Sequence, residues 1–299
     1  MRTASPLRYP GGKSAMADLL IEIRRLNGLT NRSIAEPYAG GAGASLSLLF
    51  SEETSEIFIN DSDLAIHDFW WSLVSEPEQF LARLSDVKLT IDEWRHQREI
   101  YKRSRDVSKS ERGFSAFYLN RCNRSGIIVN GGPIGGINQA GKWKLDARFN
   151  RLELERRCRK VSEYASRINV SSYDGLEFLG RTDSESTMYF IDPPYFEKGA
   201  LLYLNALDEE HHRALANYLR AMDDQAWILT YDDCPEIREM YESWANVRCY
   251  SLRYSVRRRR LGTEVLVAPN WMRLPGSESS AGLKWHLDRS KTPRDSAAA

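Results

Sequence analysis

The sequence has little cysteine, almost no net charge and no long apolar run. Its four cysteines show no paired C-x-x-C spacing. The absence of paired cysteines excludes the usual zinc-ligand pattern and a secreted disulfide framework. It favours a reducing, cytoplasmic compartment. No apolar stretch reaches membrane-spanning length, and the N-terminus lacks a signal-peptide pattern. We therefore expect a cytoplasmic protein that uses no metal and contacts no membrane.

The balance of charges limits what a nucleic-acid-binding surface can look like. The 42 basic and 41 acidic side chains leave a formal net charge of +1 at pH 7. Any such surface must therefore be a local basic patch and not a global excess of charge. With 299 residues, 42% of them hydrophobic, the chain can bury a sizeable core and form one large domain or two small ones.

The sequence also lacks a complete P-loop. Gly11-Gly12-Lys13-Ser14 resembles the end of one, but Leu7 stands where the first glycine is required. No second phosphate or Mg²⁺ signature follows. These absences exclude a nucleotide triphosphatase.

The most informative segment that is present is Asp192-Pro193-Pro194-Tyr195, which follows the apolar run 188–191. Proline removes backbone donors and pushes the residue before it toward extended geometry. The Asp192 carboxylate and the Pro193 carbonyl are thus acceptors that no local amide easily satisfies. Tyr195 adds a flat ring with a polar tip. Two acceptors and an aromatic face suit a planar, amine-bearing ring such as a nucleobase.

A second candidate site lies upstream. A predicted strand, 33–38, runs directly into the glycine-rich loop 39–43, and a segment of helical composition follows. Residues 56–61 read as a second strand that ends in Asp61, about 20 residues beyond the loop, where an acid can accept both hydroxyls of a ribose. The spacing is not G-x-G-x-x-G. Loop and acid together predict a cofactor that contains a nucleoside.

Strand-like and helical runs alternate at both ends of the chain. Alternation of this kind predicts an α/β fold with a mostly parallel sheet. The helical runs are 150–165 and 208–222. The remaining strand-like runs are 170–173, 188–191, 226–230, 247–252 and 264–267.

The middle of the chain differs from its ends. Residues 66–148 are rich in Trp, Arg and Lys, and Thr90 with Glu93 predicts a capping box at a helix start. The glycine-punctuated segment 126–137 is hairpin-like. We interpret 66–148 as an inserted, mainly helical domain with a mobile hairpin; a helical cap with a loose loop is the alternative. Residues 1–65 and 149–273 then form one discontinuous domain, and 274–299 a flexible tail.

The motif order resembles that of the Dam-type adenine-N6 DNA methyltransferases: cofactor loop first, target-recognition insert next, catalytic loop last. The resemblance spans roughly residues 5–270 and implies a doubly wound, seven-stranded Rossmann-like methyltransferase sheet. The segments that carry it are Leu7-Arg8-Tyr9-Pro10-Gly11-Gly12-Lys13, 36–43, Asn60-Asp61, 117–126, 148–150, Asp192-Pro193-Pro194-Tyr195 and 262–267.

The resemblance implies a site-specific enzyme that flips an adenine out of the duplex and methylates its N6 amine from S-adenosyl-L-methionine. The implied catalytic residues are Asp192, Pro193, Pro194 and Tyr195, with the first two supplying acceptors for the amine and Tyr195 stacking on the base. The implied cofactor-binding residues are Tyr9, Lys13, Glu36, Pro37, Ala39, Gly40, Gly41, Gly43, Asp61, Asp174 and Asp192.

Double-stranded DNA is the implied partner. The resemblance also implies that 66–148 is the target-recognition domain with a DNA-binding hairpin, and that 1–65 and 149–273 form the catalytic domain, which binds S-adenosyl-L-methionine. Side chains suited to phosphate and base-edge contacts occur in the insert and in the basic run 257–260. A solvated charged face is the alternative interpretation of that run. The candidate DNA-binding residues are Arg121, Asn123, Arg124, Lys142, Lys144, Arg257 and Arg258.

Several alternatives stay open at this point. Lys13 is compatible with a solvated surface lysine, and Asp174 with a cap at a strand end. Cytosine N4, an RNA, a protein glutamine amide, or a non-catalytic DNA-binding role would use the same fold. Segment 141–146 lacks the aromatic and basic run of the best-known Dam enzymes, so a GATC target is not implied. A cognate restriction endonuclease in a restriction-modification system, an orphan role and a mobile-element origin all fit.

Overall fold

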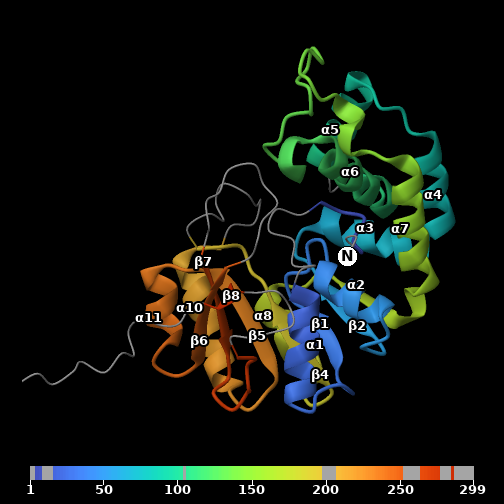
Figure 1. The fold of residues 1–299 in the computed structure, drawn as a ribbon. Helices are drawn as coiled ribbons and strands as arrows, with labels where there is room; N and C mark the ends of the chain where they lie inside the picture. Colours follow the sequence, from blue (N-terminus) through green and yellow to red (C-terminus); the bar gives the residue numbers. More distant parts are fainter. Residues whose placement is uncertain are drawn as a thin grey trace, which may run out of the picture.

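The computed structural model describes residues 4–8, 16–103, 106–196, 207–251, 263–276 and 284–285. Its centre is a sheet with the strand order β3-β2-β1-β4-β5-β7-β6-β8 (Figure 1). Strands from β3 to β5 pair in parallel, and β7 is antiparallel to both β5 and β6. The predicted α/β class, mostly parallel sheet and seven strand segments are confirmed. The strands are β1 (Ser33–Glu36), β2 (Ile57–Asn60), β3 (Ile168–Ser171), β4 (Thr187–Ile191), β5 (Trp227–Asp232), β6 (Asn246–Ser251), β7 (Thr263–Ala268) and β8 (Lys284–Trp285).

The eighth strand lies inside the segment that the sequence predicts to be a flexible tail. Lys284 and Trp285 pair antiparallel with Ser251 and Tyr250 of β6. An edge strand offers unpaired backbone groups that a passing segment can satisfy. The tail prediction is therefore wrong for these two residues, which extend the sheet.

Helices cover both faces of the sheet (Figure 1). Every residue of β4 is buried; Met188 and Phe190 belong to the apolar cluster that includes α1 and α2, whereas Tyr189 and Ile191 belong to the one that includes α8, α10 and α11. Strands buried on both faces read as continuous apolar runs, which is why the sequence revealed them. The helices on these faces are α1 (Ala17–Leu26), α2 (Gly43–Phe50), α8 (Gly175–Arg181), α10 (Glu209–Ala221) and α11 (Pro235–Tyr241).

The segment between β2 and β3 is helical, as predicted, and stands above the sheet in Figure 1. Phe69 and Phe117 stack with ring centroids 5.7 Å apart, and Phe80 and Phe114 pack around them. These rings belong to the same apolar cluster as α1 and α2. The expected boundary between residues 65 and 66 therefore falls inside α3 and within a continuous core. The helices are α3 (Leu64–Ser75), α4 (Pro77–Asp86), α5 (Ile91–Lys102), α6 (Lys109–Cys122) and α7 (Arg151–Glu163).

Helices α3 and α6 approach each other closely. A Cβ added at Gly113 would lie 2.4 Å from the Asp68 carbonyl oxygen, so only glycine fits there without a shift of the backbone. Beside it, Arg112 Nε lies 2.5 Å from Asp68 Oδ2, and His67 Nδ1 lies 2.7 Å from Asp68 Oδ1. The Asp68 side chain is 1% exposed. A buried ion pair thus joins the inserted helices to the helix that follows β2.

Two predicted local features are corrected by the structure. Thr90 caps α5 by accepting from the Glu93 amide at 3.2 Å, but Glu93 Oε1 accepts from Gln97 Nε2; the full capping box is instead at the start of α6. The hairpin-like segment 126–137 contains no strand, and an isolated antiparallel bridge between Asn123 and Pro133 closes it. Its many glycines favour tight turns over a ladder.

Candidate active site

The carboxyl ends of three neighbouring parallel strands bring the predicted motifs together. β1 lies between β2 and β4 in the sheet. Glu36 ends β1, Asn60 ends β2, and Asp192 follows β4 directly. In open α/β sheets, ligands bind in the crevice outside these ends. The glycine loop, Asp61 and the Asp-Pro-Pro-Tyr segment therefore surround one site.

The Asp192 side chain is oriented by the next strand. Thr230 Oγ1, on β5, donates a hydrogen bond of 2.7 Å to Asp192 Oδ1. Pro193 is buried, and Asp192 is partly exposed. A carboxylate fixed in this way at a strand tip presents its acceptors in one direction, as the proposed contact with an amine requires.

Two acidic residues hold the aromatic end of the same segment. Tyr195 Oη donates to Glu264 Oε1 at 2.7 Å, and the Phe196 amide donates to Asp232 Oδ1 at 3.0 Å. Glu264 and Asp232 are buried, 5% and 4% exposed. Sequence reasoning missed both acids and Thr230. The available signal was a polar residue within or directly after the apolar strand runs 226–230 and 264–267.

The glycine loop is held from two sides. Gly40 has φ of 45°, in the left-handed region that glycine adopts at little cost. Its amide donates to Asp61 Oδ2 at 2.8 Å, and its carbonyl accepts from Trp70 Nε1 at 2.9 Å. Pro37, Ala39 and Gly41 are buried beside it, and Gly43 begins α2. Sequence reasoning missed Trp70, which acts from α3.

A buried carboxyl group, Glu36, and a half-buried one, Asp61, flank this loop. Burial, and secondly the charge of Asp63, raises the pKa of Asp61 to about 7. Burial also raises the pKa of Glu36 to about 7, and the charge of Asp192 adds to the effect. Glu36 Oε1 accepts from the Ser45 amide at 2.8 Å, near the start of α2. Each carboxylate oxygen has two lone pairs, so Asp61 keeps acceptor capacity for hydroxyl groups.

Asn60 and Asp174 shape the rim of the site. Asn60 Nδ2 donates to the carbonyls of Pro37 and Tyr173, both at 2.9 Å, and so joins the ends of β1, β2 and β3. Asp174 Oδ1 accepts from the Leu176 amide at 2.9 Å and caps α8. The capping interpretation of Asp174 therefore agrees with this contact; a role in cofactor binding stays a prediction.

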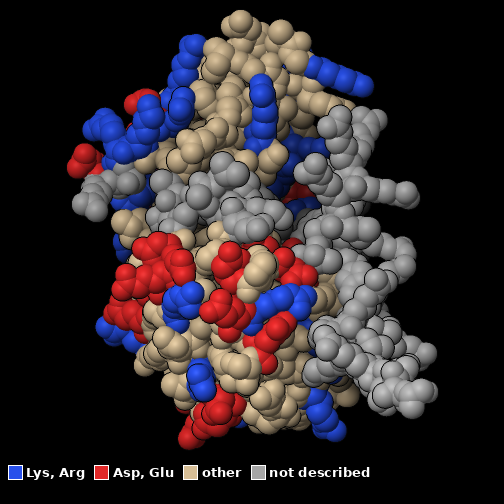
Figure 2. Space-filling model, turned by 90° about the vertical axis from the view of Figure 1, so that its left-hand side faces the viewer, with Lys and Arg blue, Asp and Glu red and all other residues tan. Residues whose placement is uncertain are grey.

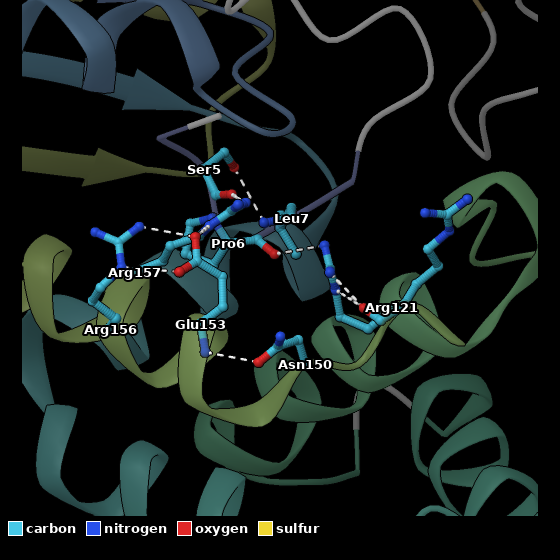
Figure 3. Close-up of polar contacts among 9 residues, drawn as sticks. Ser5, Pro6, Leu7, Arg121, Asn150, Glu153, Arg156 and Arg157 are labelled. Carbon is cyan, nitrogen blue, oxygen red and sulfur yellow. Dashed lines mark hydrogen bonds and ion pairs between the residues drawn. The ribbon is translucent and has the colours of Figure 1, made fainter. Parts of the chain in front are cut away.

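Two of the candidate DNA-binding residues are interior groups. Asn123 is fully buried, with Oδ1 accepting from Trp94 Nε1 at 2.7 Å. Arg121 donates to the Arg148 carbonyl at 2.9 Å and to the Pro6 carbonyl at 3.4 Å, and Arg157 donates to the Ser5 carbonyl at 3.0 Å (Figure 3). These contacts fix the segment that leads into the N-terminal motif. We therefore leave Arg121 and Asn123 out of the proposed DNA interface.

Three other candidates are exposed on the inserted segment, namely Arg124, Lys142 and Lys144. Lys142 Nζ lies 5.9 Å from the ring centroid of Trp143, whose exposed fraction is 67%. Segment 66–148 has 14 Lys and Arg residues against 10 Asp and Glu residues. In Figure 2, basic side chains spread over the upper, inserted part of this face, and acidic ones gather below. Tyr9, Lys13, Arg257 and Arg258 lie outside the described residues.

The part of the chain that the structure describes holds neither a cluster of metal-ligand side chains nor a membrane-spanning helix. Its described residues include no group of three or more His, Cys, Asp or Glu arranged to hold a metal ion. Its described helices include none with the length and apolar character needed to cross a bilayer.

The strand order, the glycine loop and the polar strand ends define an α/β protein of the methyltransferase type. The family model of the D12 class N6 adenine-specific DNA methyltransferases matches residues 9–256. The chain belongs to this family and is an adenine-specific DNA methyltransferase, which confirms the resemblance seen in the sequence. No curated protein matches the chain significantly. A similar solved structure is the rRNA methyltransferase aviRa from Streptomyces viridochromogenes, with 13% identity, a TM-score of 0.34, and coverage of 87% of this chain and 85% of that one.

Proposed function

We propose that this enzyme methylates the N6 amine of an adenine within a specific DNA sequence, after the base has been flipped out of the duplex. The observation that carries the proposal is the Asp192 carboxylate, oriented by Thr230 at the tip of β4, beside the glycine loop that follows β1. An extruded base is the only form in which the N6 amine can reach such a site.

The residues at the strand ends fit S-adenosyl-L-methionine. Asp61 can accept from ribose hydroxyls, and the left-handed turn at Gly40 lets the backbone approach a nucleoside closely. The pKa values of Glu36 and Asp61 are raised to about 7, and a nearby cation would lower them again by stabilising the ionised carboxylates. The cofactor, when bound, supplies an electrophilic methyl group on a positively charged sulfur.

Asp192 and the Pro193 carbonyl then act on the target amine. The lone pair of an exocyclic amine is delocalised into the ring, so the nitrogen is a poor nucleophile. Two acceptors that bind its two N–H groups favour a tetrahedral nitrogen with its lone pair directed at the methyl group. The bound cofactor would supply the methyl group from its sulfonium and leave as the neutral thioether, while the methylated nitrogen, held by Asp192 and the Pro193 carbonyl, would lose one proton to solvent. Positioning and electrostatics supply the catalysis, without a covalent enzyme intermediate.

The proposal is tested by methyl transfer from isotope-labelled S-adenosyl-L-methionine to unmethylated genomic DNA. Nucleoside digestion and mass spectrometry should detect N6-methyladenine, and sequencing of the modified positions should give one recognition site. N4-methylcytosine as the product, or label found only in RNA or protein, would contradict the proposal. Cofactor binding by calorimetry in the same preparation separates an inactive enzyme from a non-catalytic DNA-binding protein.

Cofactor affinity is expected to rise with pH between about 5 and 8. In the free enzyme the pKa values of Glu36 and Asp61 are raised to about 7. A cationic ligand favours their ionised forms, so binding should release protons and strengthen as these groups lose theirs. Calorimetry in buffers of different ionisation enthalpy measures both effects. S-adenosylhomocysteine lacks the sulfonium charge and should show a weaker dependence; equal pH profiles for the two ligands would contradict this prediction.

The Lys142→Ala variant is expected to weaken DNA binding about equally for all sequences. Lys142 is exposed on the inserted segment, and loss of one phosphate contact should lower the salt dependence of log K by about one unit. Fluorescence anisotropy at several salt concentrations measures this slope. Arg25→Ala is the matched control, because Arg25 lies on α1, away from the insert, and pairs with Glu53. The same slope in both variants would show that Lys142 does not contact DNA phosphates.

A further inference from the structure

Asp232 and Glu264 face each other on two neighbouring strands, and both accept hydrogen bonds from the segment that follows β4, residues 192–196. They are paired residues in the antiparallel register of β5 and β7. Asp232 accepts from the Phe196 amide at 3.0 Å, and Glu264 accepts from the Tyr195 hydroxyl at 2.7 Å. Like charges at directly opposed positions are not favoured by sheet pairing itself. Their placement is therefore explained better by their hydrogen bonds to Tyr195 and Phe196 than by the stability of the sheet.

The Glu264 carboxylate is itself fixed in orientation. Tyr250, fully buried and directly opposite Glu264 in the pairing of β6 with β7, donates its hydroxyl to Glu264 Oε2 at 2.6 Å. One carboxylate oxygen of Glu264 thus accepts a hydrogen bond from Tyr250, and the other accepts one from Tyr195. Hydrogen bonds to a charged acceptor are stronger than neutral ones. The phenol of Tyr195 is consequently tied to strand β7 of the sheet, although Tyr195 itself lies outside the strands.

We propose that Glu264, supported by Tyr250, is a positioning residue that sets the angle of the Tyr195 ring, and that Asp232 sets the path of the backbone at Phe196. This inference rests on the proposed function and on the stacking of Tyr195 on the flipped adenine that the family resemblance implies. Neither acid would touch the base. Glu264 acts through the Tyr195 hydroxyl, so the ring is held in place before DNA binds, and less ordering remains to be done in the complex.

The test compares Glu264→Gln, Tyr195→Phe and the double variant with the wild-type enzyme. The substrate is a duplex that carries the recognition site mapped by sequencing, and single-turnover methyl transfer is measured with saturating cofactor. Each single variant should slow transfer about tenfold, with cofactor and DNA dissociation constants within about twofold of wild type. The double variant should be no slower than the slower single variant, because both changes act on one hydrogen bond: Tyr195→Phe removes its donor, and Glu264→Gln replaces its charged acceptor with a neutral one.

A spectroscopic readout distinguishes positioning from general destabilisation. With 2-aminopurine in place of the target adenine, the variants should show a changed fluorescence amplitude in the complex, since the base is stacked less well. Glu242→Gln, an exposed acid paired with Arg238, is the control and should behave as wild type. Thermal melting confirms that the variants are folded; Tyr250→Phe, which leaves Glu264 and Tyr195 unchanged, should give a smaller loss of rate.

Several outcomes would overturn the inference. Multiplicative losses in the double variant would show that Glu264 does not act through Tyr195. Loss of cofactor binding together with a much lower melting temperature would make Glu264 a structural residue only. Variants as fast as an active wild-type enzyme would contradict the positioning role alone, whereas a wild-type enzyme without any methyl transfer would contradict the proposed function as well.

Discussion

Replacement of Asp192 by alanine is expected to slow methyl transfer by about 10²- to 10³-fold, which is typical for loss of one preorganised electrostatic group. Asp192 follows β4 and accepts from Thr230 Oγ1 at 2.7 Å, so its side chain is held where the amine must bind. Without it, the Pro193 carbonyl is the remaining acceptor. Single-turnover kinetics with labelled cofactor measures the loss, and DNA binding should change little because the proposed DNA-binding surface lies on the insert.

Two further variants sharpen this result. Asp192→Asn keeps an acceptor oxygen and should retain more activity than Asp192→Ala. Asp224→Ala removes an exposed acid located just before β5 and should leave the rate unchanged. If Asp192→Ala transferred methyl groups at the wild-type rate, the proposed role of the strand tip would be wrong, whatever product the enzyme makes.

Replacement of Asp68 by alanine is expected to lower the free energy of unfolding by about 3–5 kcal/mol. The Asp68 carboxylate is almost fully buried and contacts Arg112 at 2.5 Å and His67 at 2.7 Å. Its removal leaves the Arg112 guanidinium, 10% exposed, without its carboxylate partner. Urea denaturation followed by circular dichroism measures the change. Because the pair joins α3 to α6, the orientation of the inserted helices on the sheet should also loosen.

An exposed ion pair provides the control for this prediction. Asp92 and Arg95 lie 3.1 Å apart on α5 with both side chains largely in solvent, and Asp92→Ala should change stability by less than about 1 kcal/mol. Equal effects of Asp68→Ala and Asp92→Ala would show that burial does not govern the α3–α6 contact.

The strands and the catalytic segment were accessible from the sequence because their signals are local. A strand covered on both faces must be apolar at successive positions, as in β4, and the run was visible without any knowledge of its neighbours. Asp192 and the glycine loop follow such runs directly, so their place at the carboxyl edge of the sheet followed from the alternation of elements. The capping residues of α7 and α10, Asn150 and Asp208, are local in the same sense.

The prediction of DNA-binding residues from residue type alone included two side chains that are buried. Arg121 and Asn123 have the chemistry for phosphate and base contacts, yet both are buried and bound to other groups of the protein. Arg124 and Lys142, of similar chemistry, are exposed on the same insert. Residues 112–122 of α6 are all buried, and Asn123 follows at the end of that helix. This burial is set by packing partners distant in sequence, such as Phe69 and Phe80.

The sequence by itself determined the α/β class, the order of the motifs, the family, and the residues expected to meet the amine. Only the tertiary structure decided which groups hold those residues. Thr230 is hydrogen-bonded to Asp192, Trp70 to Gly40, and Glu264 to Tyr195, and the last two residues are 69 positions apart in the chain. A single hydrogen bond over such a separation leaves no periodic pattern in the sequence. It exists because the strand order places β5 and β7 beside the end of β4, and that order is fixed by packing of the whole sheet.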